Sequence, residues 1–135
     1  MAPTLTTMPG RQAAARQRYV TNSVETHSPA RLVTMLYDKM VSELERAEIM
    51  GPTDLFAWNE ALVRCEAIVL ELRASLDVSA WDGGPGLAAL YDFFVREIIQ
   101  ANITRDIERV RSVRALIEPL RDAWHQAAAQ LNGAH

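Results

Sequence analysis

LFAWNEALVRCEAIVLELRASL, residues 55–76, is the stretch of this 135-residue sequence that decides the fold. Its apolar residues recur at alternating steps of three and four, which places them along one face of an α-helix. This alternation is typical of helices that pack in a left-handed bundle. The spacing predicts an inner face made of Leu55, Trp58, Leu62, Cys65, Val69, Leu72 and Leu76.

Three further helices are predicted, one before this stretch and two after it. Ser28 is a good N-cap and Pro29 suits a first helical position, so a helix begins there and ends before Gly51-Pro52. Thr53 or Asp54 caps the helix that follows. The segment 77–86 is predicted to be a loop, followed by a helix over 87–103 and, after a cap at Asp106, by a helix running to about residue 130. Pro119 is expected to kink this last helix without breaking it, because the apolar period continues beyond it. The other predicted inner faces are Leu32, Val33, Leu36, Tyr37, Met40, Leu44 and Ala47, and Ile107, Val110, Val113, Ile117, Leu120 and Trp124.

These helices predict an all-α fold, because no stretch shows the alternation of a strand. Short connections between successive helices favour an antiparallel up-down four-helix bundle over residues 25–135. Residues 1–24 are predicted to be a flexible arm with a short helix over 11–24. The acidic residues of the bundle are expected on its outer faces, namely Glu43, Glu45, Glu60, Glu66 and Glu71.

Charge is unevenly distributed between these two parts. The arm contains Arg11, Arg16 and Arg18 and no acidic residue, whereas the remainder has 11 basic and 17 acidic residues and a net charge of −6. A basic arm beside an acidic body can either lie on that body or remain a solvated tail. The net charge of −3 lacks the basic excess that is typical of nucleic-acid-binding proteins. One cysteine, no signal peptide and no apolar run of spanning length favour a cytoplasmic protein without membrane insertion.

The residues that usually carry chemistry are not grouped here. The histidines are His27, His125 and His135, and none has a partner at metal-ligand spacing. Cys65 falls on a predicted inner face, so we interpret it as a packing thiol rather than a nucleophile. We therefore expect no catalytic residues, no metal and no cofactor, and a protein that is not an enzyme.

The third helix carries more apolar surface than one face requires. Leu87, Tyr91, Phe94, Ile98 and Ala101 group on the core side, while Ala88, Val95 and Ile99 form a second stripe with Asn102 at its edge. The stripe either packs on a neighbouring helix or forms a groove for a partner helix. Likewise, Asn102 either forms a hydrogen bond with the backbone of a partner helix or stabilises the turn before Asp106.

A series of landmarks follows in order along about residues 19–124. They are Tyr19, Val24, Ser28-Pro29, Leu32, Met35-Leu36-Tyr37-Asp38, Leu76-Asp77, Gly83-Gly84, Leu90-Tyr91-Asp92-Phe93-Phe94, Ala101-Asn102, Asp106 and Ala123-Trp124. At these landmarks the chain resembles the FliS family of flagellar chaperones. It departs from the family pattern after Gly84, where Pro85-Gly86-Leu87 replaces Glu-Ile-Ala, and at Pro119.

The resemblance implies a helical bundle that binds the disordered C-terminal segment of flagellin, prevents early polymerisation and presents flagellin to the export gate. It also implies that the segment around Tyr19 covers part of the binding surface until flagellin displaces it. The alternative is another adaptor or secretion chaperone that binds an amphipathic helix of a different partner. Together, the resemblance and the third helix predict a binding site of Tyr19, Val24, Leu36, Tyr37, Leu90, Tyr91, Val95, Ile98, Ile99 and Asn102.

Overall fold

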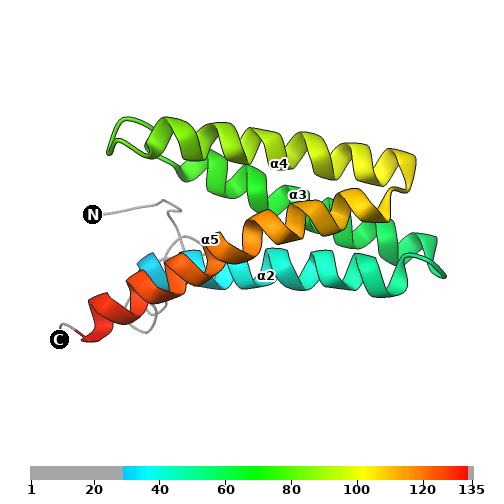
Figure 1. The fold of residues 1–135 in the computed structure, drawn as a ribbon, viewed down its shortest axis with the longest axis horizontal. Coiled ribbons are helices and arrows are strands. Elements are labelled where there is room, and N and C mark those ends of the chain that lie inside the picture. The colour runs from blue at the N-terminus through cyan, green and yellow to red at the C-terminus, as the bar shows by residue number, and fades with distance from the viewer. Residues whose placement is uncertain (1–28, 134–135) are drawn as a thin grey trace, which may run out of the picture.

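The computed structural model describes residues 29–133, which form four helices joined by short turns (Figure 1). They are α2 (Pro29–Met50), α3 (Leu55–Ser75), α4 (Gly84–Thr104) and α5 (Ile107–Gly133). Successive helices run antiparallel (Figure 1), and each packs on its neighbours in the chain, with α5 closing the bundle against α2. Within the described residues there is no strand, so the predicted all-α up-down bundle is confirmed.

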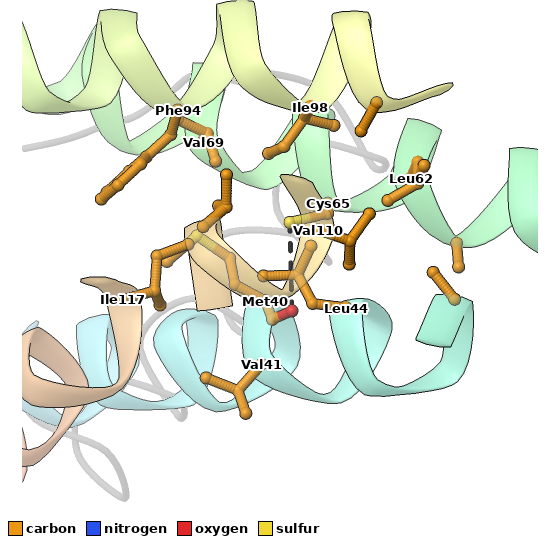
Figure 2. Packing of buried hydrophobic residues seen from close by; sticks show 14 of the residues in the cluster. Met40, Val41, Leu44, Leu62, Cys65, Val69, Phe94, Ile98, Val110 and Ile117 are labelled. Carbon is orange, nitrogen blue, oxygen red and sulfur yellow. Dashed lines mark hydrogen bonds between the residues drawn. The ribbon is translucent and has the colours of Figure 1, made fainter. Parts of the chain in front are cut away.

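The core lies along the predicted inner faces of all four helices. Figure 2 shows Met40 and Leu44 of α2, Cys65 of α3, Ile98 of α4 and Val110 of α5 converging in one cluster. The Cys65 thiol donates to the carbonyl oxygen of Met40 at 3.9 Å and is fully buried. Close packing of large apolar groups from every helix is what makes the four segments one structural unit.

One end of the bundle holds both the α2–α3 turn and the α4–α5 turn. Asp54 caps α3 by accepting a hydrogen bond from the Ala57 amide at 2.9 Å. Gly51 packs so closely on the Trp58 ring that an added Cβ would lie 2.3 Å from a ring atom. Arg105 adopts a left-handed backbone, with φ of 58°, and donates to the Gly51 carbonyl at 3.3 Å while its guanidinium lies 5.6 Å from the Trp58 ring centroid. Arg105 therefore joins the two turns through a hydrogen bond and a cation–π contact.

Helix boundaries differ from the prediction mainly at α4. This helix begins at Gly84 rather than residue 87, and Gly83 is its N-cap residue. The early start is possible because Pro85 occupies one of the first helical positions, where a backbone N–H has no partner within the helix and its absence costs nothing. A Cβ on Gly84 would lie 2.1 Å from the Val78 carbonyl oxygen, so only glycine fits there. The predicted cap at Asp106 is confirmed by a hydrogen bond from the Arg109 amide at 3.1 Å. Helix α5 continues through Pro119 to Gly133, so the prediction that Pro119 does not break this helix is confirmed.

Two predicted orientations are wrong. Leu55 is 59% exposed, because it is the first residue of α3 and lies before the turn that packs on the core. Glu43 is only 2% exposed. It lies on the side of α2 that faces α3, where Lys39 approaches it to 3.1 Å, Arg46 to 3.6 Å and Arg64 to 4.0 Å. Three cations thus surround a carboxylate that sequence spacing alone placed in solvent.

We expect replacement of Ile98 by alanine to lower the free energy of unfolding by about 2–5 kcal/mol, because the side chain is 1% exposed and its loss leaves a cavity. Ile99→Ala is the matched control, since Ile99 is only half-buried. Urea denaturation followed by circular dichroism measures both. Equal losses for the two variants would contradict the assignment of the core face.

Candidate functional site

Helix α3 presents apolar residues on two opposite faces. Its inner face packs in the core, and its outer stripe, which we define as Phe56, Val63, Ala67, Leu70 and Ala74, is exposed along its whole length. Phe56, Val63 and Leu70 are each seven residues apart, the repeat that faces a partner helix in a coiled coil. No element of the described chain covers this stripe.

A cleft of about 520 Å³ lies beside the outer stripe, between α2 and α3. Apolar side chains form almost all of its wall, and Met35 at its edge is exposed. We call it the α2–α3 cleft, and its lining residues are Leu32, Met35, Leu36, Ala67, Ile68 and Glu71.

On the other side of the outer stripe, α4 lies against α3 with polar contacts at both ends of the seam. The Asn102 side chain donates to the Asn59 side chain at 2.9 Å, and Arg73 donates to Asp92 at 3.1 Å. Val95 and Ile99 lie between these contacts along α4, and both are half-buried. The second stripe predicted on α4 therefore packs partly against α3 and partly borders the exposed face. Ala88, predicted on the same stripe, is buried.

Several residues predicted to bind a partner lie inside the bundle. Tyr37, Tyr91 and Ile98 are almost fully buried, so their side chains do not form the outer surface. The Tyr37 and Tyr91 hydroxyl groups are 2.7 Å apart and share a hydrogen bond. Burial raises the pKa of Tyr91, and the bond to Tyr37 raises this pKa further. Burial also raises the pKa of Tyr37, although its hydrogen bonds partly oppose that shift.

The remaining predicted site residues are more accessible. Leu36 lines the α2–α3 cleft, whereas half-buried Leu90 packs against the core. Asn102 is half-buried, and its backbone carbonyl accepts a hydrogen bond from the Trp58 indole at 3.5 Å. Tyr19 and Val24 lie outside the described residues.

The sequence prediction missed the outer stripe of α3. Its signal was available, because Phe56, Val63, Ala67, Leu70 and Ala74 repeat at steps of three, four and seven. The prediction assigned only the inner repeat of this helix, which contains more large apolar residues. The outer repeat has the same period but starts at a different residue, so it lies on another face of the helix. The α2–α3 cleft could not be predicted in this way, because it depends on how two helices lie side by side.

A smaller hollow of about 210 Å³ lies near the 77–83 loop. Trp81, Trp124, Leu87 and Tyr91 form part of its lining, so Tyr91 borders this hollow although it is nearly buried. The Trp124 ring also lies 6.3 Å from the Tyr37 ring, which closes the core next to the hollow.

The described part of the chain offers no arrangement for metal or thiol chemistry. No group of three or more His, Cys, Asp or Glu residues between residues 29 and 133 lies close enough to hold a metal ion. Burial, with smaller contributions from Glu43 and Glu66, raises the pKa of the Cys65 thiol to about 12. A thiol that stays protonated and enclosed is a poor nucleophile.

Across residues 29–133, every helix lacks the continuous apolar stretch that a transmembrane span requires.

The sequence of this chain is similar to those of flagellar chaperones. The sequence profile of the family described as "Flagellar protein FliS" matches residues 11–131. The flagellar secretion chaperone FliS of Escherichia coli K12 is 36% identical over 121 residues, which cover 87% of this chain and 88% of that protein. The flagellar secretion chaperone FliS of Bacillus subtilis 168 is 32% identical over 110 residues, covering 81% of this chain and 82% of that protein.

A solved structure described as "Crystal structure of flagellar chaperone from bacteria" has the same fold. It matches with a TM-score of 0.70 at 24% sequence identity, covering 88% of this chain and 98% of that one. At this identity the likeness concerns the fold.

We expect the free energy of unfolding to fall as the pH rises above about 9. Tyr37, Tyr91 and Cys65 have raised pKa values in the folded chain and ordinary values, about 10 for tyrosine and about 8.5 for cysteine, in the unfolded chain. A raised folded pKa gives stability that is fully present below the unfolded pKa and is lost as the pH rises through the folded pKa.

Urea denaturation between pH 8 and pH 11 measures this loss. The double variant Tyr37→Phe/Tyr91→Phe should show a shallower decline above pH 10, because it keeps the rings and removes the two ionising hydroxyls. A stability that stays constant up to pH 11 would show that these groups are not held neutral by burial.

Proposed function

Because this chain belongs to the FliS family of flagellar secretion chaperones, we propose that it binds the C-terminal segment of flagellin in the cytoplasm, prevents its premature polymerisation and aids its delivery to the export gate. In this proposal the protein acts by binding alone and performs no catalysis. The single observation that carries the proposal is the uncovered outer stripe of α3.

An exposed apolar stripe of this length favours a helical partner. Phe56, Val63 and Leu70 are exposed, and large exposed apolar surfaces usually mark interfaces. From Phe56 to Ala74 the stripe extends about 27 Å at the helical rise of about 1.5 Å per residue. A partner helix with apolar residues at steps of three and four would pack along it.

The surfaces on either side enlarge the area that such a partner would bury. The α2–α3 cleft provides apolar surface on one side of the stripe, and Val95 and Ile99 border it on the other. A disordered segment that folds on binding loses a few kcal/mol to ordering, so it needs a long interface with well-buried anchors. The three adjoining surfaces meet this requirement better than a single helix face.

Leu70→Asp should weaken binding of a flagellin C-terminal peptide more than tenfold, because truncating or charging an anchor costs about 2 kcal/mol or more. Leu116→Asp is a closely matched control, since Leu70 is 47% exposed and Leu116 on α5 is 46% exposed. Isothermal titration calorimetry measures affinity, and a thermal melt checks that both variants fold. Equal affinities for the two variants would place the partner on a different face.

We propose that residues 1–24 cover part of this surface in the free protein. The support is the family resemblance around Tyr19 and the contrast between the basic arm and the acidic remainder of the chain. These residues lie outside the part of the chain that the structure describes.

Deletion of residues 1–24 should increase the fluorescence of an added hydrophobic dye and raise the affinity for the flagellin peptide, because a competing segment is removed. Fluorescence titration and calorimetry measure the two effects. If neither changes, the arm does not cover the binding surface.

A further inference from the structure

The α2–α3 cleft has one charged group in an otherwise apolar lining. Leu32, Met35 and Leu36 come from α2, and Ala67 and Ile68 come from α3. Glu71, also on α3, is exposed at the cleft. A ligand of this cleft therefore meets hydrocarbon surface and a single carboxylate.

In the part of the chain that the structure describes, Glu43 and Glu60 between α2 and α3 have ion-pair partners, whereas Glu71 has none. Arg46 lies 2.6 Å from Glu60, and this hydrogen bond lowers the pKa of Glu60. Glu43 is surrounded by Lys39, Arg46 and Arg64. Among residues 29–133, Glu71 has no ion-pair partner. Arg64, two turns earlier on the same side of α3, is engaged by Glu60 at 3.4 Å.

We propose that the α2–α3 cleft receives an arginine or lysine side chain of the partner helix, whose charged end pairs with Glu71. This inference rests on the proposed function and specifies the chemistry of the segment that is bound. The long aliphatic part of such a side chain packs on Met35 and Ile68, while its cation reaches the exposed carboxylate. The partner is thus an amphipathic helix that carries a basic residue next to its apolar anchors.

Charge complementarity at this position selects among apolar helices. The outer stripe of α3 accepts any helix with the appropriate period, because dispersion and hydrophobic burial are not directional. An ion pair at one point of the surface favours the register and direction that bring the cation to Glu71. Electrostatic pairs of this kind contribute more to specificity and association rate than to total affinity.

The test uses the full chain and a peptide with the flagellin C-terminal sequence. Glu71→Gln keeps the size of the side chain and removes its charge, and it should weaken binding about three- to fivefold at low salt, the range of a partly exposed ion pair. The difference from wild type should shrink in 0.5 M salt, because screening weakens the wild-type pair. Glu45→Gln is the matched control, because Glu45 is an exposed glutamate on the side of α2 toward α5 and makes the same charge change.

A charge exchange identifies the basic residue of the peptide. Glu71→Arg should weaken binding further, and among peptides in which one basic residue at a time is replaced by glutamate, one should restore the affinity for this variant. The register that this pair defines can then be checked against cross-links from the variant Ala74→Cys, because Ala74 is a small, exposed residue at the end of the outer stripe.

Each contrary outcome overturns the proposal in a recognisable way. Equal affinities for Glu71→Gln and Glu45→Gln, together with weakened binding by Leu70→Asp, would overturn this inference and leave the proposed function standing. Tighter binding by Glu71→Gln would mean that the carboxylate holds the chain's own basic residues 1–24. A dimer that dissociates on Glu71→Gln would mean that a second copy occupies the cleft. No binding of the peptide to the wild-type chain would overturn the proposed function and this inference together.

Discussion

Helix α3 has apolar side chains on two faces, and only one of these faces packs in the core. Its inner face, from Trp58 to Leu72, packs in the core against α2, α4 and α5. A four-helix ring can enclose only one face of each member, so the outer stripe from Phe56 to Ala74 stays in solvent. The folded bundle therefore retains an apolar surface that a further helix can bury.

Polar contacts hold this surface in place from both sides of α3. On the α4 side, Asn59 bonds Asn102 at one end of the seam and Arg73 bonds Asp92 at the other. On the α2 side, buried Glu43 collects three cations from α2 and α3. Removing a buried charge from water costs free energy unless partners compensate it, so this group favours the one alignment of α2 and α3 that brings the cations together. At the turn end, Arg105 ties Trp58 to Gly51.

Within residues 29–133, the one thiol and the two paired tyrosine hydroxyl groups lie in the core and not on the outer stripe of α3. Cys65 and the paired hydroxyls of Tyr37 and Tyr91 are enclosed, and burial raises the pKa of all three groups. The exposed face consists instead of aliphatic and aromatic groups with a few carboxylates at its edges. Such a face is suited to holding a polypeptide segment, which agrees with membership of a chaperone family.

Residue spacing alone predicted the four helices and most of the core residues, because the period of an α-helix assigns each position to a face. It also identified the cap at Asp106 and limited the cap of α3 to Thr53 or Asp54, since capping is local, and it contained the family resemblance. The structure shows that Asp54 is the cap of α3.

The surroundings of each helix face depend on tertiary packing. Glu43 lies on a flank that periodicity marks as polar, and only the approach of α3 encloses it. Tyr37, Tyr91 and Ile98 lie on faces that the sequence assigned to the core, although the same three residues were also included in the predicted binding site. Packing of the four helices buries their side chains, which removes them from the outer surface. The α2–α3 cleft exists only because two helices lie side by side. Spacing along one helix contains no information about the distance to the next.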